Sequence, residues 1–96
     1  MTVLSFDRYP VAPDRIEDFE RAVVDLLVAM RTSPGALWAE GLRAPDSSGG
    51  YVVLAEWRTD ADVDAWGSSE RAAAFADSVD VLLGAEVTRR RFVSPG

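Results

Sequence analysis

Cysteine, histidine, lysine, asparagine and glutamine are all missing from the 96-residue sequence. Without cysteine there are no disulfides, thiolate nucleophiles or iron–sulfur ligands, and without histidine the usual ligands of zinc, copper and haem iron are missing. Schiff-base and pyridoxal-phosphate chemistry require lysine, and a Ser-His-Asp triad requires histidine. Any metal chemistry would therefore depend on carboxylates alone.

Positive charge and long apolar runs are also scarce. The chain has 10 basic residues against 16 acidic ones, a formal net charge of −6, so we expect neither nucleic acid nor an anionic membrane as a partner. No stretch approaches the roughly 18 apolar residues of a membrane span. The first residues, MTVLSFDRYPV, interrupt their apolar positions with charge and proline. By default, the expected location is the cytoplasm.

Apolar residues make up 48% of the sequence, which is enough for a packed core. A chain of this length is the size of one domain, which we assign to residues 1–96. Such a short domain buries only about two-thirds of the surface of its unfolded chain. A second copy of the chain would therefore add stability.

Alternating apolar and polar positions predict four strands. The strands are expected over residues 2–9, 36–43, 51–58 and 85–93. The segment 44–50, APDSSGG, has the composition of a turn between the second and third strands, which we therefore expect to form a hairpin.

Apolar residues at three- and four-residue steps predict a helix that begins near Arg15 and ends at Ser33-Pro34-Gly35. Asp14 followed by Glu17 predicts an acidic capping box at its start. A second helix should begin after Thr59, break at Gly67-Ser68-Ser69 and resume to about Leu83. Thr59, together with Asp62, is expected to cap it.

The order strand, helix, strand, strand, helix, strand is typical of a ferredoxin-like α+β sandwich of the split βαββαβ type. In that fold a four-stranded antiparallel sheet carries its helices on one face. The other face would include Leu4, Phe6, Val52 and Leu54, with no part of the chain to cover it. Because such an apolar face marks an interface, we expect a homodimer in which two sheets pack face to face.

Several motifs along this pattern occur together. They are the first strand leading into a proline-containing turn (RYPVAPDRIEDFE), a helix ending in SPGAL, a third strand ending in AEW, and the continuation WRTDADVDAWGSS. With them, nearly the whole chain resembles the antibiotic biosynthesis monooxygenase-like members of the dimeric α+β barrel superfamily. The resemblance implies a barrel formed across a dimer and a pocket inside each subunit, between the sheet and its helices.

Quinone-forming members of this family oxidise anthrone-like or phenolic polyketides with O2, using neither metal nor flavin. The resemblance therefore implies a cofactor-independent monooxygenase whose partners are O2 and an aromatic small-molecule substrate. An alternative on the same fold is a non-redox protein: a polyketide cyclase-like or isomerase-like enzyme, or a binding protein for an aromatic metabolite.

The resemblance also implies which residues of this chain correspond to functional positions of the family. Trp57 matches the pocket tryptophan at the end of the third strand, and Asp7 falls where haem-degrading members place an asparagine. The asparagine of quinone-forming members, four residues before the tryptophan, is Val53 here. The helix that would supply a haem-ligating histidine offers Trp66 and Arg71 instead, which argues against haem degradation.

Ser5, Asp7 and Tyr9 share the face of the first strand that the helices should cover. One interpretation is a polar pocket in which Asp7 is a general base whose burial raises its proton affinity, with Tyr9 orienting the substrate. The other is an ion pair between Asp7 and an arginine of the run Arg89-Arg90-Arg91, or a register in which Asp7 faces water. Alternation places Arg90 opposite to its two neighbours in that run.

The aromatic candidates are also open to two interpretations. Trp57 either stacks on an aromatic substrate and donates its indole N–H to an oxyanion, or anchors the core. Trp38 and Trp66 either line the cavity or pack, and Tyr51 and Val53 are further candidates for substrate contact. The acidic run Asp60, Asp62 and Asp64 is not expected to bind a metal, because alternate residues of a helix do not converge on one point.

Overall fold

The computed structural model describes residues 1–46 and 49–95. Its elements, in chain order, are β1 (Thr2–Tyr9), the 3-10 turn η1 (Pro13–Arg15), α1 (Ile16–Arg31), β2 (Ala36–Arg43), β3 (Tyr51–Trp57), α2 (Asp60–Gly67), α3 (Glu70–Val79), the 3-10 turn η2 (Asp80–Leu82) and β4 (Thr88–Ser94). The predicted hairpin turn over residues 44–50 includes positions 47 and 48, which lie outside the described residues.

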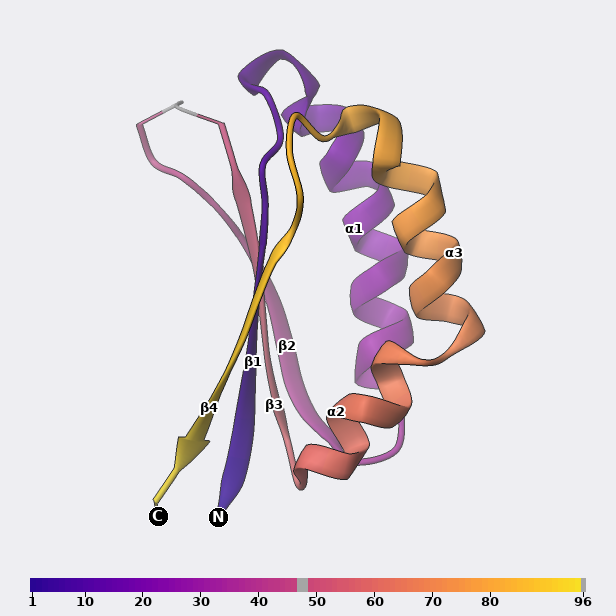
Figure 1. Ribbon diagram of the computed structural model, residues 1–96. Helices are drawn as coiled ribbons and strands as arrows, with labels where there is room; N and C mark the ends of the chain where they lie inside the picture. The colour runs from indigo at the N-terminus through magenta and orange to yellow at the C-terminus, as the bar shows by residue number, and fades with distance from the viewer. Residues whose placement is uncertain (47–48, 96) are drawn as a thin grey trace.

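The four strands form one antiparallel sheet in the order β2-β3-β1-β4. Figure 1 shows this sheet nearly edge-on, with all the helices packed against one face and the opposite face uncovered. The predicted ferredoxin-like α+β architecture is therefore confirmed. Within the described residues, no helix is both long and apolar enough to cross a membrane.

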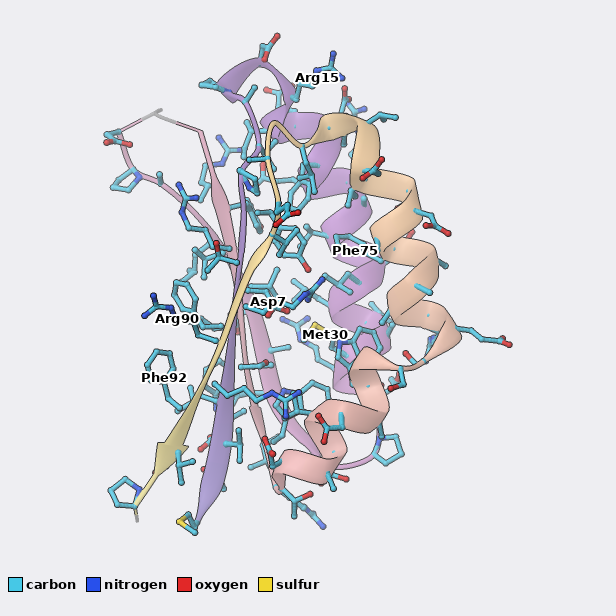
Figure 2. All side chains as sticks on the ribbon, in the orientation of Figure 1. Asp7, Arg15, Met30, Phe75, Arg90 and Phe92 are labelled. Carbon is cyan, nitrogen blue, oxygen red and sulfur yellow. The ribbon has the colours of Figure 1, made fainter. Side chains whose placement is uncertain are left out.

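Strand alternation assigns side chains of β1 and β4 to the two faces as the sequence predicts. Asp7 points toward the helices, whereas Arg90 and Phe92 point away from them (Figure 2). The register explains this split, because Asp7 pairs with Arg89 across the strands while Phe6 pairs with Arg90. The arginine run is thus divided between the covered face and the open face.

The core lies between the sheet and α1. Its largest fully buried side chains include Trp57, Phe19 and Met30. Phe19 is the centre of an aromatic cluster, with ring centroids 5.1 Å from Tyr9 and 5.2 Å from Tyr51. Burying rings of this size is the main stabilisation available to so short a chain.

The two predicted helix caps have different outcomes. Thr59 caps α2 by accepting from the backbone N–H of Asp62. The predicted capping role of Asp14 is wrong, because Pro13 starts a 3-10 turn there and Arg15 is the residue that precedes α1. In the part of the chain that the structure describes, no side-chain hydrogen bond caps the start of α1.

The last strand begins later than predicted, at Thr88 rather than at residue 85. The segment before it makes other contacts: Leu83 forms an isolated bridge with Val11, and the backbone N–H of Gly84 donates to the Pro10 carbonyl at 2.9 Å. The helical region also ends earlier, with α3 finishing at Val79 and η2 following it. Pairing with the loop after β1 thus delays β4 by three residues.

Candidate functional site

A cavity of about 270 Å³ lies between the sheet and the helices. Its walls come from the inner face of β1, the start of β4, one side chain of α1, and the facing sides of α2 and α3. The lining residues include Ser5, Asp7, Tyr9, Leu26, Val63, Trp66, Gly67, Ala72, Ala73, Phe75, Ala76, Arg89 and Arg91. Aromatic and small apolar side chains meet a few polar groups here, which is the composition of a small-molecule site.

Asp7 is the acidic group of this cavity. Its side chain is only 14% exposed, and one of its carboxylate oxygens accepts a hydrogen bond from Arg89 Nη1 at 3.1 Å. Burial raises the pKa of Asp7 above its usual 3.8, although Arg89 and Arg91 both act to lower it. The ion pair and the cavity position, considered as alternatives from the sequence, therefore occur together.

Tyr9 closes one end of the cavity beside Asp7. Its ring packs between Phe19 and Phe75, with the Phe75 centroid 5.7 Å away in an edge-to-face arrangement. Burial, followed by the nearby charge of Asp7, raises the pKa of Tyr9 to about 12. The phenol is therefore neutral at any physiological pH and available as a hydrogen-bond donor.

Trp57 lies one layer behind the cavity rather than in its wall. Its ring is fully buried, and its indole N–H donates to Ser5 Oγ at 3.0 Å. It stacks on Trp66, with centroids 6.3 Å apart and planes inclined by 26°. Trp57 thus supports two residues that do line the cavity, and its own N–H is already engaged.

Arg91 joins the opposite wall to α2. Its guanidinium donates to Asp60 and to Asp64, each at 2.7 Å. These two carboxylates are four residues apart in the sequence, a spacing that makes them neighbours on one face of the helix. Within the described residues, no group of three acidic side chains is arranged to hold a metal ion.

Three of the proposed substrate contacts lie outside the cavity. Trp38 is on the open face, where its indole N–H donates to Glu56 at 2.8 Å, because alternation along β2 turns it away from the helices. Val53 is buried on the covered face beside Asp7 and is not among the described residues that line the cavity. Tyr51 packs on Phe19, closer to the hairpin end of the sheet.

The alanine-rich wall of α3 was missed by sequence reasoning. Ala72, Ala73 and Ala76 face the cavity together with Phe75. The signal was present in the run RAAAFA. Small residues on a helix that covers a sheet leave space between the two layers, and this space is the cavity.

The fold and the cavity together define a ferredoxin-like α+β protein with a pocket between its sheet and its helices. A family model described as antibiotic biosynthesis monooxygenase matches residues 4–78. The chain therefore belongs to the antibiotic biosynthesis monooxygenase family. No curated protein sequence gives a significant match.

Solved structures share the whole fold at low sequence identity. A protein from Nitrosomonas europaea, assigned to the same family, has a TM-score of 0.90 and 16% identity, covering 98% of this chain and 90% of its own. A family protein from Caulobacter crescentus has a TM-score of 0.87 and 18% identity, covering 99% and 91%. A variant of SnoaB, a cofactor-independent oxygenase from Streptomyces nogalater, has a TM-score of 0.82 and 20% identity, covering 99% and 94%.

Proposed function

We propose that this protein is a cofactor-independent monooxygenase that oxidises an aromatic polyketide, phenol or anthrone with O2. Family membership and the likeness in fold to a cofactor-independent oxygenase support the reaction class. The observation that carries the proposal is the position of Asp7. It is a largely buried carboxylate of raised pKa, in a cavity walled by aromatic and small apolar side chains. Such a carboxylate is a stronger base than one in water.

The reaction begins when Asp7 removes a proton from the acidic methylene of an anthrone-type substrate. The resulting carbanion is delocalised over the aromatic system and gives its electrons to O2, so that a C–O bond forms and a peroxide results. The protonated Asp7 then returns its proton to the peroxide. Loss of the remaining C–H proton and cleavage of the O–O bond yield the quinone carbonyl and one molecule of water, and Asp7 is again ionised.

The other cavity residues orient the substrate and stabilise charge. Trp66 and Tyr9 line the cavity, and in this proposal the ring of Trp66 stacks on the substrate while the neutral phenol of Tyr9 donates to an oxygen of the substrate or the peroxide. Trp57 acts from behind, through Ser5 and Trp66. Direct contact of the substrate with Tyr51, Val53 or Trp38 would need a bound position that reaches beyond the cavity.

We also propose that the protein works as a homodimer. Phe92 and Leu42 on the open face are about half exposed, at 52% and 51%, and Phe6 and Leu54 lie between them on the central strands. A second sheet packed on this face would remove these side chains from water, at about 25 cal/mol for each Å² of apolar surface buried.

The test is O2 consumption by the purified protein with a panel of anthrones and hydroquinones. An absorption spectrum recorded beforehand shows whether flavin or haem is bound. We expect O2 uptake equimolar with quinone formation and no turnover without O2. Product formed anaerobically would instead support a cyclase or isomerase, and binding that shifts tryptophan fluorescence without turnover would support a metabolite-binding protein.

A further inference from the structure

The Ser5 hydroxyl is buried beside the cavity, and it can both accept and donate a hydrogen bond. The residue is 6% exposed and lines the cavity, and its Oγ accepts the indole N–H of Trp57 at 3.0 Å. A serine hydroxyl has one O–H to donate besides the lone pairs with which it accepts. Among the described residues, no acceptor takes the Ser5 proton. Because Ser5 lines the cavity and its Oγ is engaged there as an acceptor, its O–H is suited to donate to a ligand in the cavity.

We infer that Ser5 is a catalytic hydrogen-bond donor to an oxygen of the substrate, and that Trp57 is the positioning residue that fixes the Ser5 hydroxyl. This inference rests on the proposed oxygenase function and deepens it. The indole N–H occupies one lone pair of Oγ, so it restricts rotation of the hydroxyl and polarises its O–H bond. The tryptophan therefore serves the reaction without touching the substrate.

Arg91 is the obvious competitor for this role, because it lies directly across the strands from Ser5. Its guanidinium is already held by Asp60 and Asp64 at 2.7 Å each. Releasing it would break two charge-assisted hydrogen bonds. The Ser5 hydroxyl needs no such rearrangement and is the donor that is ready to act.

The position of Ser5 relative to Asp7 defines the class of substrate. Ser5 and Asp7 are two residues apart on the same face of β1, so the rise of the strand separates them by about 6.6 Å. An aromatic ring system can span that interval with an acidic C–H or O–H at Asp7 and a carbonyl or phenol oxygen at Ser5. Negative charge generated at Asp7's end is delocalised onto the oxygen that Ser5 holds. The site therefore selects aromatic compounds that carry an oxygen conjugated with the acidic position.

A binding experiment tests Ser5 without any turnover. The probes are 1-tetralone and tetralin, two bicyclic compounds of the same shape that differ by one carbonyl, and the measurement is equilibrium dialysis. We expect wild-type protein to prefer 1-tetralone, and Ser5→Ala to weaken 1-tetralone binding roughly 10-fold while leaving tetralin unchanged. The control Ser78→Ala, on the exposed side of α3, should keep the preference. Equal binding of both probes by wild-type protein, or binding of neither, overturns the inference.

The role of Trp57 is tested by a double-mutant cycle on O2 consumption with 1,8-dihydroxyanthrone. Ser5→Ala should lower kcat about 10²-fold with little change in KM. Trp57→Phe should lower kcat in the wild-type background but have no further effect when Ser5→Ala is already present. Additive losses, or a loss confined to KM, would contradict the positioning role. If Trp57→Phe does not fold, the probe preference of Ser5→Ala still decides the role of Ser5.

If no anthrone or hydroquinone is oxidised, the oxygenase proposal fails, but the carbonyl preference remains measurable. If O2 is consumed but the preference is absent, the oxygenase proposal stands and the Ser5 inference fails. The two experiments therefore test the oxygenase proposal and the role of Ser5 separately.

Discussion

The two faces of the central sheet have opposite chemistry, and each is unusual for its position. The covered face of β1 carries Ser5, Asp7 and Tyr9, polar groups that the helices shield from water. The open face of the same strand carries Leu4 and Phe6, apolar groups that no helix shields (Figure 1). Polar groups under a helix layer reduce stability, so their presence points to chemistry, whereas uncovered apolar groups point to a partner.

Two adjacent arginines of β4 lie on opposite faces of the sheet and allow the two faces to be compared within one strand. Arg89 reaches the covered face and pairs with Asp7 at 3.1 Å, while Arg90 points to the open face beside Phe92 (Figure 2). The side chains are identical, and only the face differs. Substitutions at both positions can therefore separate the effects of charge from the effects of location.

The largest expected effect is the loss of Asp7, the proposed base on the covered face. Asp7→Asn keeps the shape of the side chain but cannot accept a proton, so kcat for anthrone oxidation should fall by about 10²- to 10⁴-fold. Circular dichroism should show an unchanged fold. Asp77→Asn, an exposed acid on α3, is the matched control and should retain full activity. Full O2 uptake by Asp7→Asn would remove the base assignment.

The next effect concerns the open face. Leu54→Glu places a charge among the apolar side chains that we assign to the dimer, and it should weaken dimerisation at least roughly 10²-fold, because an unpaired carboxylate resists burial. Sedimentation analysis measures this. Val81→Glu, at a side chain 76% exposed away from the sheet, should leave the dimer intact. A wild-type protein that is monomeric at micromolar concentration would refute the proposed interface.

A smaller effect tests how tightly the covered face is packed near its hairpin end. A Cβ added at Gly41 would lie 2.6 Å from the phenol oxygen of Tyr51, so Gly41→Ala must displace that ring from Phe19. We expect a loss of about 1–3 kcal/mol in the free energy of unfolding, measured by urea denaturation. Gly67→Ala, where no atom lies within 4 Å of the added carbon, should cause no such loss. Equal stabilities of the two variants would show that the ring moves freely.

The smallest effect is a shift in pH dependence. Arg89 lowers the pKa of Asp7 against the larger effect of burial, so Arg89→Gln should raise that pKa further. The acid limb of kcat/KM should therefore move to higher pH, and the movement should be small because Arg89 is more than half exposed. Arg90→Gln on the open face should leave the limb in place. An equal shift in both variants would mean that overall charge, rather than the ion pair, controls Asp7.

Most of the fold was predictable because it depends on periodicity, which a single sequence displays. The alternation of β1 and the helical spacing of α1 gave their faces correctly, and the opposite orientations of Arg89 and Arg90 followed from the same rule. The delayed start of β4 was not predictable, because it depends on Leu83 pairing with Val11, far away along the chain. Because Leu83 and Val11 lie far apart in the sequence, local residue patterns do not indicate that they pair.

The site was only partly predictable. Alternation brought Ser5, Asp7 and Tyr9 together, but it could not show that Trp57 would use its N–H on Ser5. That hydrogen bond depends on the lateral register of β1 and β3, which the sequence does not specify. The face of Trp38 was not predictable either, because an aromatic residue in a strand gives no indication of its face until the register is known.

The most direct test of Asp7 as the base is a titration of its side-chain carboxyl by 13C NMR, compared with the pH dependence of O2 consumption by the same protein. We expect a midpoint above the usual 3.8, because burial favours the neutral acid, and an acid limb of kcat/KM at that same midpoint. Activity should rise as Asp7 ionises. A midpoint at or below 3.8, or an activity limb that does not follow it, would contradict the assignment of Asp7 as the base.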